Sequence, residues 1–371
     1  MSPLEDLLQQ KTFTNEEIAR LRSLTPPDEC EALRARAYDL TTELMGDAVY
    51  FRGLIEISNI CTANCRYCGI RKDNHSVVRY TLDEDTILSC ARLARDWGYG
   101  SIAIQAGERR DEKWVAFIER ILTRIHAETL SDDLPDGLGV TLSLGEQLLE
   151  VYERWAAAHG SRNNLRYLLR IESSNPTLFN RLHCTPGKNE KVLENRYRAL
   201  MHLRQAGYQV GTGVMIGLPS QTVEDLVGDI RTFQRLDADM IGMGPYLTSL
   251  GADMVEDGQM EHDALLRRTL NMIAVTRLVL RDTNIAAATA LETLQPRGRI
   301  AGIRHGCNVI MPNITPQATR SSYQLYDNKA GTEVGAESNR LLEADIVRLS
   351  GRRIGFNLLG SSKHWAARTN A

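Results

Sequence analysis

The sequence predicts an α/β fold: a complete (β/α)8 barrel of the TIM type, with a helical extension before it and a second extension after it. From about residue 50 onward, short apolar or β-rich runs alternate with helix-length segments that repeat apolar residues near i, i+3 and i+4. Such alternation is typical of a parallel sheet covered by helices. Eight runs fit a barrel, which typically needs ~250 residues. An open doubly wound sheet is disfavoured because no Gly-x-Gly-x-x-Gly motif opens a βαβ unit.

The same patterns divide the chain into three parts. They are an N-terminal helical extension over 1–48, the barrel over 49–313, and a C-terminal extension over 314–371 that we expect to pack on the barrel. In the first part, Thr14 and Glu17 form a capping box that opens one helix, because each side chain can bond the backbone N–H of the other. Pro26 and Pro27 then introduce a second helix.

The barrel strands are expected at eight places in chain order. They are FRGLIEIS (51–58), SIAIQAG (101–107), GVTLSL (139–144), RYLLRIE (166–172), QVGTGVMIG (209–217), DMIGMGPYL (239–247), NIAAATAL (284–291) and CNVIMPN (307–313). Amphipathic helices are expected between them, for example DEDTILSCARLARDWG and TVEDLVGDIRTFQRL. Thr81 and Glu84 are predicted to cap the first of these two helices.

Composition excludes several classes of protein. A net charge of −3, with 25% charged and 43% hydrophobic residues, is ordinary for a globular chain. There is no basic excess of the kind that marks a nucleic-acid binder, and no apolar run near the ~20 residues of a membrane span. The start of the sequence lacks a signal-peptide pattern, and seven cysteines, an odd count, do not suggest a disulfide scaffold. We therefore expect a cytoplasmic protein that binds neither nucleic acid nor membrane.

Three cysteines carry the strongest functional signal. Cys61, Cys65 and Cys68 follow the first expected strand, where the βα loops of a barrel build the catalytic face. Structural zinc usually takes four closed ligands, and an electron-transfer iron–sulfur cluster usually takes four cysteines. Three thiolates instead leave one iron with an open position for a ligand. Two other interpretations stay open: a zinc site with His75 as fourth ligand, and three unrelated packing cysteines.

The spacing Cys-x3-Cys-x2-Cys, with Tyr67 before the last cysteine, resembles the radical S-adenosylmethionine (SAM) superfamily. Six segments, in order over most of 50–325, closely resemble HydE, a family of FeFe-hydrogenase maturases. They are FRGLIEISNICTANCRYCGIRKDN, IAIQAGE, VTLSLGE, YLLRIESSNP, MIGLPSQT and NVIMPNITP. Methylornithine synthase and biotin synthase share the architecture but match these segments less well.

The resemblance implies that Cys61, Cys65 and Cys68 are the metal-binding and catalytic residues and hold one 4Fe–4S cluster. The family cleaves SAM reductively to a 5′-deoxyadenosyl radical. The positions that match SAM contacts of the family are Tyr67, Gln105, Gly107, Glu108, Thr141, Ser143, Arg170, Glu172 and Arg196. Of these, Glu108 would receive the SAM ammonium. Arg196 suits the SAM carboxylate because its planar fork can pair both oxygens.

The sequence departs from the HydE pattern at several places, one of which is the segment TSLGADM after Pro245, which lacks a Pro-His-Pro-like loop. Ile171 replaces a His, and Ala288 replaces the first Thr of a Thr-Thr pair on strand seven, which leaves Thr289. No cysteine follows Cys307, so the second cluster that some members carry is not expected.

Side chains alternate between the two faces of a barrel strand, and this alternation predicts a polar interior. Arg52 and Glu56 on strand one, and Arg170 and Glu172 on strand four, fall on the faces opposite to the apolar residues. Ordinary barrels fill the interior with bulky apolar side chains. We therefore predict a solvent-filled cavity beneath SAM, where Arg52, Glu56 and Thr289 contact the substrate; a closed Arg–Glu network that only packs the core is the alternative.

The expected function is that of a HydE-type radical SAM enzyme in maturation of the FeFe-hydrogenase active-site cluster. The resemblance implies a small polar or organometallic iron substrate, an electron donor such as flavodoxin or ferredoxin, and other hydrogenase maturases as partners. One alternative is a related enzyme that acts on an amino-acid-like organic substrate, as methylornithine synthase does. A zinc-stabilised binding module is the alternative outside enzymes.

Overall fold

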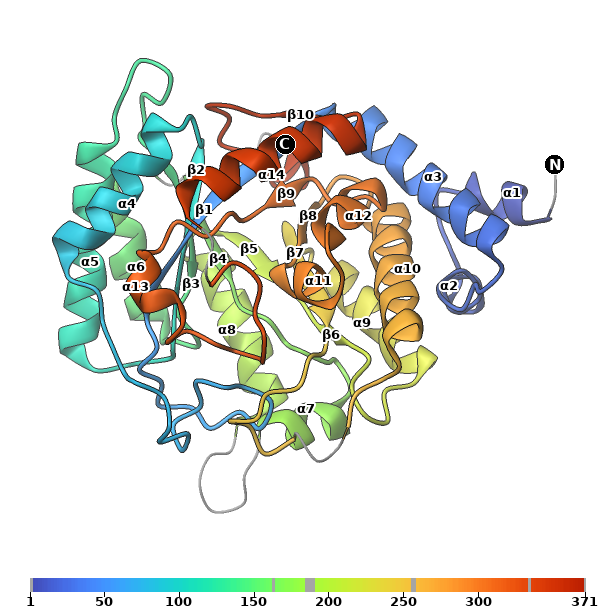
Figure 1. Ribbon diagram of the computed structural model, residues 1–371, viewed down its shortest axis with the longest axis horizontal. Coiled ribbons are helices and arrows are strands. Elements are labelled where there is room, and N and C mark those ends of the chain that lie inside the picture. The colour runs from blue at the N-terminus through green and yellow to red at the C-terminus, as the bar shows by residue number, and fades with distance from the viewer. Residues whose placement is uncertain (1–2, 162–163, 184–190, 255–257, 333–334, 370–371) are drawn as a thin grey trace.

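The computed structural model describes residues 3–161, 164–183, 191–254, 258–332 and 335–369, which form a closed parallel barrel (Figure 1). The barrel strands are β1 (Ala48–Ser58), β2 (Ser101–Ala106), β3 (Gly139–Ser143), β4 (Leu165–Leu168), β5 (Gln209–Thr212), β7 (Met240–Pro245), β8 (Asn284–Ala287) and β9 (Val309–Ile310). Each pairs in parallel with the next, and β1 also pairs with β9, which closes the ring. The predicted TIM-type barrel is confirmed.

Two short strands lie off this ring. β6 (Met215–Ile216) follows β5 and pairs with the end of β7. β10 (Arg353–Ile354) comes from the C-terminal part of the chain and pairs with the start of β1, where Ala48 lies opposite Arg353. The first barrel strand therefore begins three residues earlier than its apolar run predicts, because a partner strand from far along the chain extends it.

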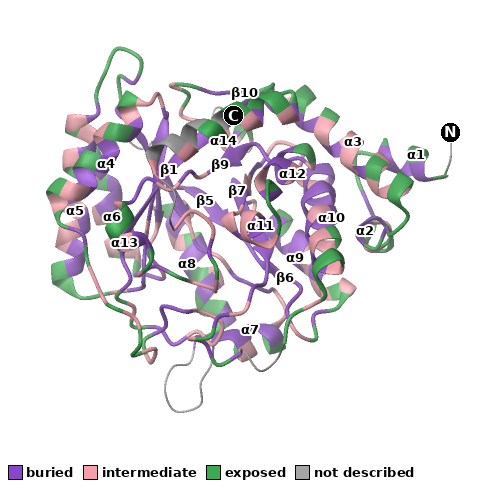
Figure 2. Cartoon of the chain, in the orientation of Figure 1, coloured by how far each residue is buried: buried purple, intermediate pink, exposed green. Residues whose placement is uncertain are grey.

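Helices surround the barrel (Figure 1). They are α4 (Glu84–Asp96), α5 (Glu112–Glu128), α6 (Leu149–His159), α7 (Pro176–His183), α8 (Leu193–Gln205), α9 (Val223–Arg235), α10 (His262–Leu280), α11 (Thr289–Leu294) and α12 (Gly298–Arg304). Alternate strand residues such as Ile55, Ile57 and Ile102 are fully buried in the apolar core. Figure 2 shows the strands as the most buried part of the molecule. The core therefore lies between strands and helices, which leaves the other strand face free for polar side chains.

The N-terminal helices are α1 (Pro3–Leu8), α2 (Asn15–Arg22) and α3 (Pro27–Met45). The capping box is confirmed: the Glu17 N–H donates to Thr14 Oγ1 over 3.2 Å, and the Thr14 N–H donates to Glu17 Oε2 over 2.8 Å. Pro27 is the first residue of α3, where a missing N–H costs nothing. α3 packs along α10, so these helices cover one side of the barrel.

The C-terminal extension contains α13 (Gln317–Arg320), α14 (Ala336–Ser350), β10 and α15 (Lys363–Thr369). Between β10 and α15 the chain crosses the barrel end where the strands begin. The carbonyl oxygen of Gly360 accepts hydrogen bonds from Arg52 Nη2 (3.1 Å) and Asn284 Nδ2 (2.9 Å), and that of Leu359 accepts one from Arg166 Nη2 (2.8 Å). Backbone carbonyls from this segment therefore stabilise buried guanidinium groups at the amino end of the barrel.

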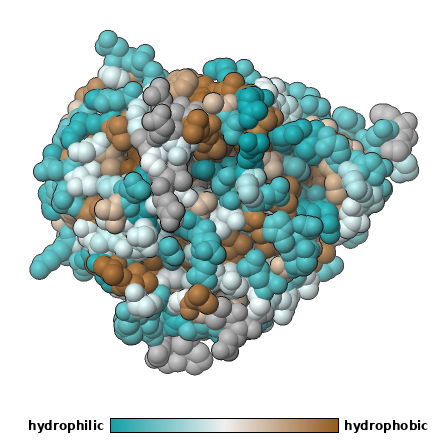
Figure 3. Space-filling model, viewed as in Figure 1, coloured by the Kyte–Doolittle hydropathy of each residue, from teal (hydrophilic) through white to brown (hydrophobic). Residues whose placement is uncertain are grey.

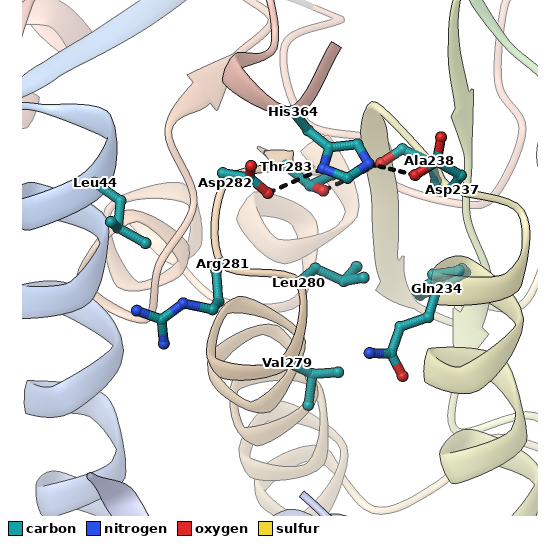
Figure 4. A pocket seen from close by; sticks show the side chains of 11 residues that line it. Leu44, Gln234, Asp237, Ala238, Val279, Leu280, Arg281, Asp282, Thr283 and His364 are labelled. Atoms are coloured by element: carbon teal, nitrogen blue, oxygen red, sulfur yellow. Dashed lines mark hydrogen bonds and ion pairs between the residues drawn. The ribbon is translucent and has the colours of Figure 1, made fainter. Parts of the chain in front are cut away.

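α15 is fastened to the same end of the barrel beside a surface pocket (Figure 4). The His364 ring lies between two carboxylates, with Nε2 2.6 Å from Asp237 Oδ1 and Nδ1 3.1 Å from Asp282 Oδ1. These bonds, that of Asp282 first, raise the pKa of His364 to about 9. Arg368 pairs with Asp237 and Asp239. Charged contacts therefore hold the last described helix in place.

Three local predictions are wrong. The N-cap of α4 is Asp83, which accepts from the Thr86 N–H over 2.8 Å, whereas Thr81 bridges back to the end of β1. β4 ends at Leu168, so Arg170 and Glu172 follow the strand; Glu172 has a φ of 62°, which an extended strand does not allow. β8 ends at Ala287, and Thr289 is the first residue of α11.

The outer surface mixes polar and apolar side chains. Figure 3 shows hydrophilic residues over much of one face, with hydrophobic residues scattered among them. Within the described ranges, the helices are all too short or too polar to cross a bilayer.

Candidate active site

A cavity opens at the carboxyl ends of the barrel strands, and most of the predicted site residues line it. Those that do are Cys61, Cys65, Tyr67, Cys68, Gln105, Gly107, Glu108, Ser143, Arg170, Glu172 and Arg196. They come from the ends of β1 to β4 and from α8, so closure of the barrel gathers residues that are far apart in sequence. This is the barrel face that carries catalytic residues in TIM-type enzymes.

Four predicted residues do not line this cavity. Thr141 lies deeper, where its hydroxyl is 3.5 Å from Arg52 Nη1. Glu56 is fully buried, pairs with Lys329 of the C-terminal extension, and accepts from Asn313 Nδ2 over 3.0 Å. Thr289 itself is absent from the lining, although its neighbours on both sides belong to it. Substrate contacts by Arg52, Glu56 and Thr289 stay a prediction.

The cysteine-bearing loop is organised by a single arginine. The Arg79 guanidinium donates to the carbonyl oxygens of Asn59 (2.6 Å), Ile70 (2.8 Å), Arg71 (2.6 Å) and Asn74 (2.9 Å). These carbonyls flank the three cysteines on both sides. One side chain therefore fixes both ends of the loop, which has no regular secondary structure to supply its hydrogen bonds.

Gly107 allows the second loop of the site to approach the first. A Cβ atom at this position would lie 2.4 Å from the Ile60 carbonyl oxygen and 2.7 Å from Cys61 Cβ, closer than atoms can pack. The neighbouring Glu108 N–H lies 3.3 Å from Cys61 Sγ and donates to it. The Gln105–Glu108 turn therefore lies directly against the first cysteine.

The three cysteines are free thiols around the cavity. Burial raises the pKa of Cys65 to about 11 and also raises the pKa values of Cys61 and Cys68. A metal would replace the proton, because thiolate is the ligand. Within the described chain, no three His, Cys, Asp or Glu side chains are grouped to hold one metal ion. In a 4Fe–4S cluster each thiolate binds a different iron, and three thiols spread around a cavity fit such a donor set.

Beside the cysteines lies a network of buried charges. Glu108 Oε2 is 2.6 Å from Lys191 Nζ, and Arg196 Nε is 2.5 Å from Glu146 Oε1. Arg110, which is half exposed, reaches both carboxylates at 3.2 and 3.3 Å. Burial raises the pKa of Glu108, but the Lys191 ammonium, the Glu146 N–H and Arg196 together outweigh burial and hold that pKa below its usual value. Burial lowers the pKa of Arg196, but Glu146 and Glu108 together outweigh burial and raise that pKa. The network is therefore charged.

Glu172 also lines the cavity. Its carboxylate is buried, and Oε2 lies 2.8 Å from Arg170 Nη2 without the geometry of a hydrogen bond. Burial raises the pKa of Glu172, and Arg170 offsets only part of that effect. A buried carboxylate oxygen without a donor can accept hydrogen bonds from a ligand, and the ribose hydroxyls of SAM are such donors.

Several lining residues were missed from the sequence. Lys191 stands in the run Lys-Asn-Glu-Lys, a pattern typical of a solvated loop, yet its side chain is buried. Tyr323 and Tyr326 come from the C-terminal extension, which reaches the cavity through a hydrogen bond from the Gly69 N–H to the Leu325 carbonyl oxygen (2.9 Å). The sequence alone does not predict that Lys191 or the two tyrosines line the cavity, because their positions depend on contacts between distant segments.

A model of the radical SAM superfamily matches residues 55–233 of this chain. The FeFe hydrogenase maturase subunit HydE of Thermotoga maritima is 37% identical over 322 residues, which cover 87% of this chain and 86% of that protein. The chain belongs to the HydE family of the radical SAM superfamily. It is therefore a radical SAM enzyme, and the zinc-stabilised binding module is excluded. Membership of the superfamily implies SAM and a 4Fe–4S cluster as cofactors.

Two crystal structures share the fold of this HydE-family enzyme. The FeFe-hydrogenase maturase HydG from Carboxydothermus hydrogenoformans has a TM-score of 0.79 at 19% identity, over 99% of this chain and 81% of that one. Methylornithine synthase (PylB) has a TM-score of 0.76 at 18% identity, over 95% of this chain and 98% of that one. At 18–19% identity, these similarities show that the fold is shared and no more.

Proposed function

We propose that the chain binds a single 4Fe–4S cluster through Cys61, Cys65 and Cys68, binds SAM next to it, and acts in the maturation of FeFe hydrogenase. One observation carries the proposal: three thiols share a cavity with the Glu108 carboxylate and the Arg196 guanidinium. These two charged groups suit the ammonium and the carboxylate of the amino-acid part of SAM. When bound, the cluster and SAM supply radical chemistry through one-electron reductive cleavage of SAM.

The protein's contribution is to orient SAM. Glu108 would accept the ammonium group, and Arg196 would donate hydrogen bonds to the carboxylate. Glu172 accepts from the ribose hydroxyls through its free oxygen. Ser143 and Gln105, at the ends of neighbouring strands, line the wall between these groups. By holding both ends of SAM, these residues would orient it beside the three thiolates.

The C-terminal extension completes the wall of the cavity. Tyr323 and Tyr326 line it, and Lys329 anchors the segment by pairing with Glu56 inside the barrel. Such a cover excludes water, which otherwise reacts with unstable intermediates. Arg170, whose side chain is 29% exposed, lines the cavity beside Glu172. We propose a small polar or organometallic iron substrate for this space, flavodoxin or ferredoxin as electron donor, and other maturases as partners.

Anaerobic reconstitution tests the proposal. We expect about four irons and four sulfides per chain, since one cluster has that composition. The reconstituted enzyme should bind SAM and, with a strong reductant, form 5′-deoxyadenosine. Supplying the reconstituted enzyme to a maturation mixture that lacks its HydE component should then restore hydrogenase activity. A zinc-loaded protein without iron, or an iron-loaded protein that does not bind SAM, contradicts the proposal.

A further inference from the structure

The groups proposed to bind the amino-acid part of SAM already have partners within the protein. Lys191 Nζ lies 2.6 Å from Glu108 Oε2, and Glu146 Oε1 lies 2.5 Å from Arg196 Nε. All four residues are buried, with at most 9% of their surface exposed. Lys191 is an alkylammonium, as is the amino group of SAM, and Glu146 is a carboxylate, as is the acid group of SAM. Lys191 and Glu146 therefore imitate the two charges of the ligand.

We propose that SAM enters this site by exchanging ion pairs with Lys191 and Glu146. The SAM ammonium replaces Lys191 on Glu108, and the SAM carboxylate replaces Glu146 on Arg196. The two displaced side chains then pair with each other; Lys191 Nζ and Glu146 Oε1 are already 3.9 Å apart. The inference rests on the SAM contacts proposed above and adds that two residues outside those contacts set the affinity for SAM.

Charge balance supports an exchange. Two buried carboxylates and two buried ammonium or guanidinium groups neutralise one another before SAM arrives. The amino-acid part of SAM adds one positive and one negative charge, so three complete pairs exist afterwards. At no stage is a buried charge left without a partner, which would cost several kcal/mol.

The structure also leaves room for Lys191 to move. Its side chain lines the inner cavity and, on its other side, an outer hollow bordered by Thr62, Arg110, Glu146 and Asn195. The Glu108–Lys191 pair therefore forms part of the partition between the two spaces. A small rotation outward takes Lys191 from Glu108 toward Glu146 without passing through the apolar core.

An internal competitor lowers the affinity of its ligand, because binding must first break the internal pairs. The Lys191→Met variant removes the competitor for Glu108. The double variant Lys191→Met with Glu146→Gln removes both competitors and also the pair that forms between them after exchange. Removing a buried charge from a ligand site usually weakens ligand binding. Here we expect the double variant to bind SAM more tightly, by roughly tenfold, which corresponds to about 1.4 kcal/mol.

The experiment measures SAM dissociation constants by equilibrium dialysis on the anaerobically reconstituted enzyme. A second ligand, 5′-methylthioadenosine, carries the same nucleoside but neither charged group of the amino acid, so its affinity should stay unchanged in every variant. Lys113→Met, an exposed lysine of α5, is the matched control and should change neither affinity. If that double variant does not fold, the double variant Lys191→Gln with Glu146→Gln, which removes the same two charges but keeps both side chains polar, tests the same sign.

Tighter SAM binding with unchanged 5′-methylthioadenosine binding supports the exchange. Unchanged or weaker SAM binding overturns it, and so does an equal change for both ligands, which indicates a general change in the cavity. These failures leave the proposed function intact as long as the wild-type enzyme binds and cleaves SAM. A wild-type enzyme that binds no SAM overturns both.

Discussion

The two ends of the barrel hold their buried charges in different ways. At the carboxyl end, Glu108 and Arg196 are paired with side chains, which can rotate and find other partners. At the amino end, Arg52 and Arg166 are bonded to the backbone carbonyls of 359–360, which belong to a segment crossing the barrel. The carboxyl end can therefore exchange its pairs for a ligand, while the amino end is closed by the chain itself.

The pKa values follow the same division. Burial lowers the pKa of Arg52 to about 10 and also lowers that of Arg166, and no carboxylate among the described residues offsets burial at either group. At the other end, Glu146 and Glu108 together more than offset burial and raise the pKa of Arg196. A buried guanidinium whose partners are neutral, such as backbone carbonyl and hydroxyl oxygens, is a structural group. One matched to a carboxylate suits recognition of a charged ligand.

The largest effect is expected from the cysteines at the carboxyl end. Replacing Cys61, Cys65 and Cys68 together by Ala should abolish iron binding and 5′-deoxyadenosine formation, because no other described thiol reaches the cavity. Iron analysis and product chromatography measure both. Cys90→Ala, on the buried face of α4, is the control and should keep full activity. Iron retained by the triple variant would place the cluster elsewhere.

Next in size is the loss of Arg196. Arg196→Ala should weaken SAM binding by about 1.5–3 kcal/mol, the range for a charged hydrogen bond, or roughly tenfold to more than a hundredfold. The variant also frees Glu146, which adds a repelling carboxylate near that of SAM. Anaerobic titration with the cluster intact gives the dissociation constant. An unchanged constant means that the SAM carboxylate binds another group.

At the amino end, Arg52→Leu sharpens the comparison. The variant leaves the Gly360 carbonyl with one donor fewer, so we expect a loss of about 1–3 kcal/mol in the free energy of unfolding. SAM cleavage should remain near the wild-type rate. Denaturant unfolding and product formation are measured on the same preparation. Loss of substrate-dependent turnover without loss of stability would instead show that Arg52 contacts substrate.

The smallest effect concerns His364, whose pKa of about 9 lies above its ordinary value of 6.5. A raised pKa in the folded state means that protonation stabilises the fold: the contribution is complete below about pH 6.5 and is lost as pH rises through 9. His364→Gln should therefore cost up to about 1 kcal/mol at pH 6 and almost nothing at pH 10. Thermal unfolding at both pH values measures this. A cost independent of pH would show that the Asp237 and Asp282 contacts do not hold a charged ring.

Much of the architecture could be predicted from local patterns. Strand and helix periodicity predicted the barrel, and the cysteine spacing predicted one wall of the cavity. Local rules failed where distant segments meet. Asp83 caps α4 because Thr81 pairs with β1, and Lys191 is buried because Glu108 lies opposite it. No periodicity in the sequence predicts that Gly360 reaches Arg52, since a loop's path depends on the finished barrel.

The central claim is that the carboxyl end binds a cluster and SAM together while the amino end is structural. Its most direct test is the electron paramagnetic resonance spectrum of the reduced, reconstituted enzyme, titrated with SAM. We predict one cluster signal that changes when SAM is added. The change should occur at similar SAM concentrations in the wild type and in Arg52→Leu, and at much higher SAM concentrations in Arg196→Ala. A signal that SAM does not change, or one that responds equally in Arg196→Ala, would contradict the account.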